Sequence, residues 1–361
     1  MIVTRQHRVK IACLCLLLFV VGIWVVCSLS RMEVSSHKNK AFESRDFVMG
    51  TLISQKVYGA QGQAAIDSAM KRMNELEKLL TFKAEQGDVY KLNQNAGKEK
   101  IALSSDTIKI LRKSQQVAEL SSGAFDITVG PLVKSWAIGT PQEHIPSYEE
   151  LKKILPLINF RDLYVDDSAA SLKRPGQMVD LGGIAKGFAG DEVIRIYKKF
   201  GIRSAFVNIG GNVITLGNKP DGTPWRVGIR NPRPDAGQTQ QSEQILATVE
   251  VVNKAVVTAG DEQRYFIKDG IRYHHILDPV TGYPARSDLM SVTLIMDSSF
   301  DADALDTAVF ILGLEKGREL IRQFGGIEAV FITADKKIYI TDGIKGSFKL
   351  YNEGNEYKLA N

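Results

Sequence analysis

The hydrophobic period of this chain changes near its middle, and that change restricts the fold class more than any other feature. Apolar residues recur three or four apart over 62–82, 104–123 and 147–158, which is the spacing of amphipathic helices. From about residue 178 onward, short alternating runs separated by turn residues predict strands, as in SAFVNIGGNVITLG (204–217). Early helices followed by strands of antiparallel character favour an α+β fold over a doubly wound parallel sheet.

Local signals place some of the boundaries. Residues 47–59, FVMGTLISQKVYG, alternate and are predicted to form a strand. Ser104 or Ser105 is expected to cap the helix that Gly123 ends. Two helices and a hairpin over 328–343 are expected near the carboxyl end.

The amino end carries a membrane signal. Residues 11–30 form an uncharged run of 20 residues behind the basic segment RQHRVK, long enough to span a bilayer. The basic flank predicts that the rest of the chain lies outside, on the periplasmic face of the inner membrane. A cleaved signal peptide is one alternative, although no Ala-x-Ala-like site is visible. A lipoprotein anchored through Cys27 is another, but Val26 stands where such signals carry a small residue.

The cysteines support this division of the chain. Cys13, Cys15 and Cys27 all lie in the apolar segment, so the exported part has no disulfide and no thiolate site. The predicted organisation is a membrane anchor or signal segment over 1–30, a polar tether over 31–45, and one domain over 46–350.

The net charge of +5 does not indicate a nucleic-acid binder. Six of the 46 basic residues and one of the 41 acidic residues lie in residues 1–40, so residues 41–361 hold 40 of each sign. The exported part is therefore neutral and lacks the basic footprint of nucleic-acid recognition.

An acidic cluster opens one of the last helices. Residues 301–307 read DADALDT and continue directly into AVFILG. Acidic residues favour the first turn of a helix, and Ser298 or Ser299 could cap that turn. Alternatively, the i, i+3, i+4 spacing of Asp303, Asp306 and Thr307 puts three oxygen ligands on one helix face, as Mg²⁺ or Ca²⁺ would require.

Three earlier stretches also carry polar residues that packing explains poorly. Asp126 lies inside the apolar run SGAFDITVGPLVKSW, where it is either a turn or capping residue or a buried acid with a partner. In VDLGGIAKGFAGD (179–191), Asp180 ends a strand and Lys186 opens a helix, so this turn is either plain or phosphate-binding. NIGGN (208–212) is expected to be a tight structural corner.

A pair of histidines precedes a rigid turn in YHHILDPVTGYPA (273–285). His274 and His275 point to opposite faces if the segment is a strand. One of them could then serve as a general base while the other is structural. Phosphate-binding turns, an oxygen-only cation site and one histidine base together describe phosphoryl-group chemistry.

Seven of these stretches, in this order, resemble the ApbE family of flavin transferases. They span residues 49–313, and each is weak alone, whereas the set in register is specific. They are MGT, GAFDITVGPL, DLGGIAKG, NIGGN, TAGDEQRYF, HILDPVTGYP and DADALDTAVFILG. The resemblance implies an ApbE-like, T-fold-related α+β domain in the bacterial envelope.

The same resemblance implies the chemistry. Members of the family cleave FAD with Mg²⁺ and transfer the FMN half through a phosphoester bond to a Ser/Thr hydroxyl of a partner protein, releasing AMP. Expected acceptors carry an Asp-x-x-Ser/Thr-Gly-Ala-Ser/Thr motif, such as subunits of sodium-translocating NADH:quinone oxidoreductase or related electron-transport complexes. The same site admitting water would instead be an FAD pyrophosphatase, and a flavin-storing lipoprotein without turnover is a third alternative.

The resemblance also implies roles for individual residues. The implied base for the incoming hydroxyl is His275. Mg²⁺ ligation is implied for Asp303, Asp306, Thr307 and the backbone carbonyl of Gly183, and FAD contacts for Met49, Lys83, Ala124, Phe125, Asp126, Asp180, Lys186 and Leu277.

Two positions depart from the usual family pattern. LLTFKAEQGD offers Phe82 and Lys83 where the family often has a TYK-like stretch. Asp306 stands where many members have serine.

Overall fold

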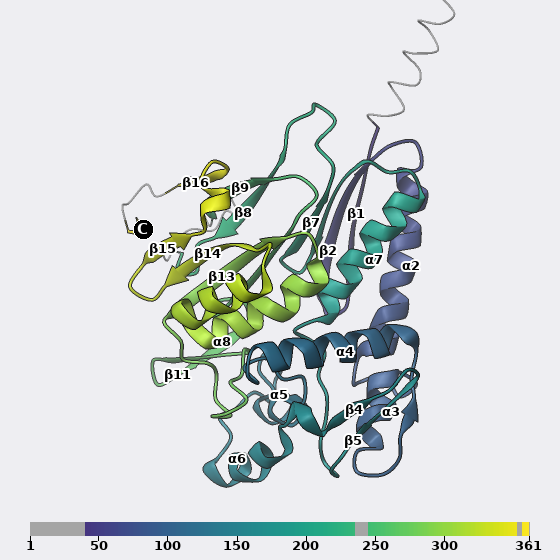
Figure 1. Cartoon of the computed structure of the whole chain (residues 1–361), viewed down its shortest axis with the longest axis vertical. Helices are drawn as coiled ribbons and strands as arrows, with labels where there is room; N and C mark the ends of the chain where they lie inside the picture. The colour runs from purple at the N-terminus through teal and green to yellow at the C-terminus, as the bar shows by residue number, and fades with distance from the viewer. Residues whose placement is uncertain (1–39, 235–244, 352–355, 361) are drawn as a thin grey trace, which may run out of the picture.

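One large sheet organises the molecule. The computed structural model describes residues 40–234, 245–351 and 356–360, and within these ranges the sheet has nine strands (Figure 1). Neighbouring strands are antiparallel except for the last pair. Their order is β1 (Ala41–Val48), β2 (Thr51–Tyr58), β6 (Ser204–Ile209), β7 (Asn212–Leu216), β10 (Ala255–Gly260), β13 (Leu289–Met296), β14 (Glu328–Thr333), β15 (Lys337–Ile340) and β17 (Lys358–Leu359).

Three long helices cover one face of this sheet. They are α2 (Gly62–Leu80), α7 (Ala185–Lys199) and α8 (Ser299–Phe324), and α7 packs between the other two. Inward-facing residues of the strands, such as Ile53 and Val207, join the helices in the main apolar core. Helix α8 consists of two segments that meet at Gly313, which matches the two helices expected from the sequence.

A second, smaller sheet covers the opposite face. Its strands are β16 (Phe348–Leu350), β9 (Ile245–Val251) and β8 (Trp225–Arg230). Val227 and Val249 of this sheet pack with Val256 and Val330 of the large sheet in a separate buried cluster. The layers are therefore helices, large sheet and small sheet, with apolar side chains between each pair.

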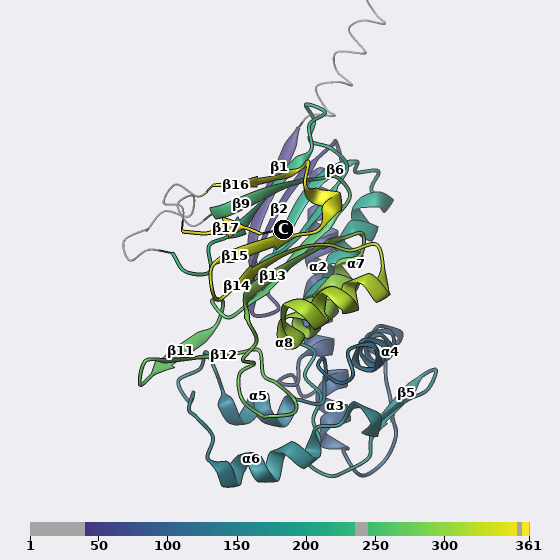
Figure 2. The ribbon, with the colours of Figure 1, turned by 60° about the vertical axis from the view of Figure 1, so that its left-hand side comes forward.

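The remaining elements gather beyond one end of the large sheet (Figure 2). Trp136 and Leu151 anchor a local cluster there, against which the β11–β12 hairpin packs through Phe266 and Tyr273. The elements are α3 (Asp88–Gln94), α4 (Ser105–Leu120), α5 (Gly130–Trp136), α6 (Tyr148–Ile154), β3 (Ile101–Ala102), β5 (Ala169–Leu172), β4 (Leu163–Val165), β11 (Tyr265–Lys268), β12 (Ile271–His274) and short 3-10 turns at 155–157 and 160–162. A third 3-10 turn, at 342–344, instead packs against β14.

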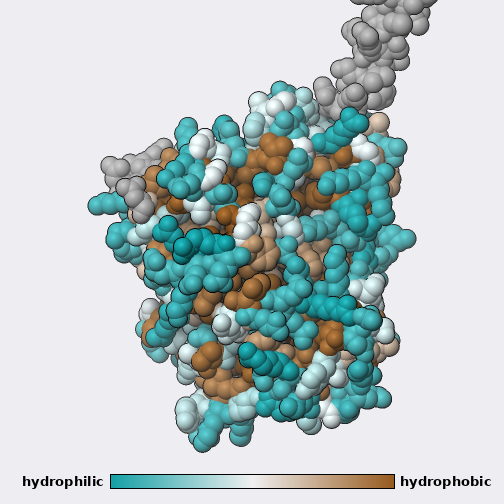
Figure 3. All heavy atoms as spheres, in the orientation of Figure 1, coloured by the Kyte–Doolittle hydropathy of each residue, from teal (hydrophilic) through white to brown (hydrophobic). Residues whose placement is uncertain are grey.

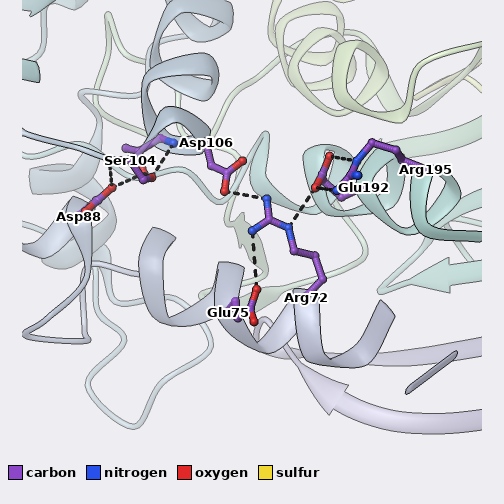
Figure 4. A network of polar contacts seen from close by, with 8 residues as sticks. Arg72, Glu75, Asp88, Ser104, Asp106, Glu192 and Arg195 are labelled. Carbon is purple, nitrogen blue, oxygen red and sulfur yellow. Dashed lines mark hydrogen bonds and ion pairs between the residues drawn. The ribbon is translucent and has the colours of Figure 1, made fainter. Parts of the chain in front are cut away.

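An ion-pair network fixes α4 to the helices of the main layer (Figure 4). Arg72 of α2 donates to Glu192 of α7 at 3.0 Å and to Asp106 of α4 at 2.7 Å. Glu192 also accepts from Arg195 at 2.7 Å, so this carboxylate is held from two sides. The network therefore connects three helices that are distant in sequence. Hydrophilic residues cover most of the face seen in Figure 3, with hydrophobic groups in separate patches.

Several sequence-based boundaries differ from the structure. The strand expected over 47–59 is a hairpin, because Met49 and Gly50 adopt φ values of 56° and 67° and turn the chain between β1 and β2. Strand β1 begins at Ala41, so the folded part starts inside the tether expected over 31–45. The Ser104 cap is confirmed, since its hydroxyl accepts from the N–H of Thr107.

The expected membrane segment, residues 1–30, lies outside the described residues. Within the ranges that the structure describes, no helix has the length and apolar character needed to cross a bilayer.

Candidate functional site

The candidate site forms where the amino ends of α7 and α8 meet. Ser298 caps α8 by accepting from the N–H of Asp301 at 3.1 Å, as one of the two sequence interpretations predicts. Asp191 of α7 adds a second cap, because its carboxylate accepts from the N–H of Ser299 at 2.8 Å and of Phe300 at 3.3 Å. This double cap fixes the start of α8 and therefore the direction of its first two turns.

Asp303 is held rigidly in those turns. Its carboxylate accepts from the backbone N–H of Gly187 at 2.8 Å and from the side-chain amide of Asn212 at 2.7 Å. The ammonium of Lys186 lies 3.4 Å away. The Gly187 N–H belongs to the first turn of α7, where a negative charge is favoured. A side chain on Gly187 would collide with the backbone of Ser299, so the close approach of the two helices requires glycine there.

Asp306 is the second buried carboxylate, one turn further along α8. Burial and the nearby Asp303 charge raise its pKa well above the usual range, and the ammonium of Lys186 opposes this shift. The Thr307 hydroxyl donates to Asp306 at 3.2 Å. The ionised form of Asp306 is therefore disfavoured by its burial and by the negative charge beside it, and a bound cation would relieve both effects.

The chain before α7 closes the other side of this cluster. A Cβ built on Gly183 would lie 3.4 Å from the Thr307 hydroxyl and 3.3 Å from the ring of Phe125, so the Gly183 backbone packs directly against α8. Two carboxylates, a hydroxyl and a backbone carbonyl form the all-oxygen donor set that Mg²⁺ prefers. The residues therefore fit this cation, although no group of three or more His, Cys, Asp or Glu side chains suited to a metal occurs in the described part of the chain.

Basic side chains lie near the neighbouring carboxylate, that of Asp180. Its carboxylate accepts from the N–H of Gly182 at 2.7 Å, and Lys186 donates to the carbonyl of that glycine at 3.0 Å. Burial raises the pKa of Asp180, while the charges of Lys186, Arg264 and Lys83 lower it. Lys83 is therefore close enough to act on the site, although it is almost 100 residues away in sequence.

The segment 124–126 lies beside this loop, but the Asp126 carboxylate has internal partners. It accepts from the N–H and the hydroxyl of Thr128, both at 2.7 Å, and from the N–H of Phe160 at 2.9 Å. This arrangement matches the turn interpretation. The N–H of Asp180 donates to the carbonyl of Ile127 at 2.8 Å, which joins the segment to the site. Ala124 and Phe125 are buried next to it.

The two histidines have different surroundings. Nε2 of His274 lies 2.9 Å from the carbonyl of Ala285, and its ring meets Phe310 edge-on at 5.5 Å, which makes this histidine part of the packing. For His275, burial and the positive charges of Arg264 and Lys186 lower the pKa to about 3. No partner for its Nδ1 occurs among the described residues. His275 is therefore neutral near pH 7 in the free protein, and the same positive charges keep its basicity low there.

Of the two apolar candidates, Met49 is linked to the site through its turn, whereas Leu277 packs elsewhere. Met49 has a positive φ of 56°, which is unusual for a residue with a long side chain and costs backbone strain. Arg264 connects this turn to the site, because its guanidinium donates to the carbonyl of Gly50 at 3.3 Å. Leu277 is buried in the separate cluster around Trp136.

The sequence patterns did not predict a role in this site for three of its residues. Asn212 was assigned only to a structural corner, and the capping role of Asp191 has no local signal. Arg264 lies in TAGDEQRYF, where its neighbours gave no reason to single it out.

Two surface hollows hold none of the candidate residues. One is bordered by Gln116 and Phe324, and the other by Lys134 and Gln177.

Several known proteins resemble this chain in sequence and in fold. The model of the ApbE family matches residues 49–331. The FAD:protein FMN transferase of Treponema pallidum is 34% identical over 324 residues, covering 84% of this chain and 88% of that protein. The FAD:protein FMN transferase of Klebsiella pneumoniae is 31% identical over 318 residues, covering 88% of this chain and 96% of that protein.

Solved structures show the same fold. The ApbE protein of Thermotoga maritima superimposes with a TM-score of 0.76 at 32% identity, covering 84% of this chain and 98% of that one. The flavin transferase ApbE of Vibrio cholerae also gives a TM-score of 0.76, at 28% identity, covering 85% of this chain and 99% of that one.

Proposed function

The chain belongs to the ApbE family and is a transferase, and on that premise we propose that it moves the FMN moiety of FAD onto a Ser or Thr hydroxyl of a partner flavoprotein. The observation that carries this proposal is the buried pair Asp303 and Asp306 beside Lys186. The pair supplies negative ligands, and the lysine supplies a positive charge for a phosphate, at one place.

We assign Mg²⁺ to Asp303, Asp306, Thr307 and the carbonyl of Gly183. When bound, the cation would draw negative charge from the diphosphate and relieve the repulsion between the carboxylates. Lys186 and Lys83 bind the anionic substrate in this proposal, and the 124–126 segment, Met49, Asp180 and Leu277 position it.

His275 acts as the general base. It takes the proton from the acceptor hydroxyl, whose oxygen forms a bond to the FMN phosphorus. The bridging P–O bond to the AMP half breaks, and its electron pair leaves on AMP. A pKa of about 3 keeps His275 neutral in the free protein. An anionic substrate offsets the charges of Lys186 and Arg264, so its binding raises the basicity of this histidine when the hydroxyl arrives.

The acceptor and the location follow the family expectation. We propose acceptors with the Asp-x-x-Ser/Thr-Gly-Ala-Ser/Thr motif, such as subunits of sodium-translocating NADH:quinone oxidoreductase or related complexes. We also propose that residues 1–30 hold the protein on the periplasmic side of the inner membrane. A reporter fused after Asn361 should then be active only outside the cytoplasm, and a cytoplasmic signal would overturn this location.

Incubation with FAD, Mg²⁺ and an acceptor that bears the motif tests the activity. Mass spectrometry should find one FMN on the acceptor hydroxyl and one AMP released for each FMN transferred. The same incubation with the His275→Ala variant serves as the control. AMP release without acceptor labelling would support an FAD pyrophosphatase instead, and FAD binding without AMP release would support a storage protein.

A further inference from the structure

Three cations act on the site, and they differ in their carboxylate partners. Lys83, Lys186 and Arg264 all lower the pKa of Asp180 through their charges. Lys186 has an ion-pair partner, Asp303 at 3.4 Å. Neither Lys83 nor Arg264 has a carboxylate within ion-pair distance in the described ranges, but only the exposed Arg264 side chain also has a hydrogen bond that orients it, to the carbonyl of Gly50. Its positive charge is therefore not neutralised by the protein.

Arg264 is tied to both sides of the site. Its carbonyl accepts from the backbone N–H of His275 at 3.0 Å, which joins its backbone to that of the proposed base. Its guanidinium donates to the carbonyl of Gly50 at 3.3 Å, in the turn that contains Met49. That bond uses one of five N–H donors and leaves the others available to a ligand.

We propose that the Arg264 guanidinium binds the diphosphate of the substrate and stabilises the charge that develops as the FMN phosphorus is transferred. This inference rests on the function proposed above and adds a catalytic residue to it. A guanidinium presents paired N–H groups that match phosphate oxygens, and it stays charged at every working pH. The turn at Gly50 holds it in place before substrate arrives, so little reorganisation is needed.

The position of Arg264 beside the base gives the proposal a second consequence. The Arg264 charge lowers the pKa of His275, as do those of Lys186 and His274. Removing the guanidinium should therefore raise the pKa of His275 and move the acid limb of the pH–rate profile to higher pH. A residue that only supported the fold would not produce this shift.

The test compares Arg264→Ala, Arg264→Lys and Arg264→Gln with the control Arg286→Ala. Arg286 is also exposed, but it makes no hydrogen bond or ion pair within the described residues. We expect Arg264→Ala to lower kcat by roughly 10²–10³-fold, the usual effect of removing one preorganised donor. Arg264→Lys should recover part of that loss, Arg264→Gln should recover little, and Arg286→Ala should match the wild type.

Two further measurements distinguish the loss of the guanidinium charge from a loss of structural stability. Soluble guanidinium at millimolar concentration should partly restore Arg264→Ala, and flavin fluorescence without Mg²⁺ should show weaker FAD binding while thermal unfolding is unchanged. A kcat within threefold of wild type would overturn the proposal. So would a loss that guanidinium does not restore and that accompanies a lower unfolding temperature. If the wild type itself releases AMP but labels no acceptor, the proposed transfer fails, whereas the Arg264 comparison can still be made on AMP release.

Discussion

Asn212 offers a sharp test of how the proposed metal ligands are oriented. Its amide donates to Asp303 at 2.7 Å, and both side chains are buried. The Asn212→Ala change removes a hydrogen bond to a charged group, which we expect to lower the free energy of unfolding by about 1.5–3 kcal/mol. Asp303 then keeps the Gly187 N–H on one oxygen, while its other oxygen keeps only the longer contact with Lys186 at 3.4 Å.

The looser carboxylate should also bind Mg²⁺ less well. Residues that orient a metal ligand typically contribute roughly 10–100-fold to metal affinity. At a fixed Mg²⁺ concentration well above the dissociation constants of both the wild type and the variant, a loss of this size removes about 1.4–2.7 kcal/mol of metal-dependent stabilisation. Urea unfolding with and without Mg²⁺ measures both effects, and a Mg²⁺ titration of the transfer rate should show recovery at high concentration.

Asn208→Ala is the matched control for this experiment. Asn208 lies in the same hairpin turn, and its side chain accepts from the N–H of Gly211 at 2.8 Å without contacting Asp303. We expect a loss of about 0.5–1.5 kcal/mol in stability and an unchanged response to Mg²⁺. If Asn212→Ala loses stability but keeps the wild-type Mg²⁺ affinity, the assignment of Asp303 as an oriented metal ligand is refuted.

Three other predictions concern the histidines and the turn after them. His275→Ala should lower the transfer rate by roughly 10²–10⁴-fold at little cost in stability. His274→Ala should instead lower the free energy of unfolding by about 1–3 kcal/mol and leave the rate per folded molecule near wild type, so equal rate losses would contradict these roles. The pKa of His275 is about 3 in the free protein, so this histidine should impose no acid limb on kcat/KM between pH 5 and 8. Because bound substrate raises its basicity, the acid limb of kcat should lie at higher pH than that of kcat/KM. Coincident limbs would show that substrate leaves this pKa unchanged. Thr281 donates to Asp278 at 3.0 Å in a turn that Trp136 holds through Gly282, so the protein alone with FAD and Mg²⁺ should gain no covalent flavin, and labelling of a Thr281 peptide would contradict this.

Local sequence patterns predicted what depends on local structure. The helices over 62–82 and 104–123, the antiparallel strands and the Ser298 cap are all present, because periodicity and capping act within one element. The Met49–Gly50 turn was missed, since the alternation of β1 continues into β2 across it. Only the positive φ values reveal the reversal.

The partners of the site residues could not be predicted in the same way. Asn212 is 91 residues from Asp303, and Gly187 is 116 residues from it. The cap that Asp191 provides to the N–H of Ser299 spans 108 residues. Such pairs depend on how α7 and α8 cross, and a single sequence carries no direct record of that crossing. The ligand spacing on α8 was visible, whereas the groups that orient it were not.

The first strand fixes how far the site stands from the point where the chain enters the fold. Strand β1 has eight residues, so at about 3.3 Å per residue its ends lie roughly 25 Å apart. The preceding residues join at Ala41, and the Met49 turn at the site follows the other end (Figure 1). The residues before Ala41 and the Met49 turn of the site are therefore separated by the full length of β1, so any attachment through the first residues would be on the side of the fold away from the site.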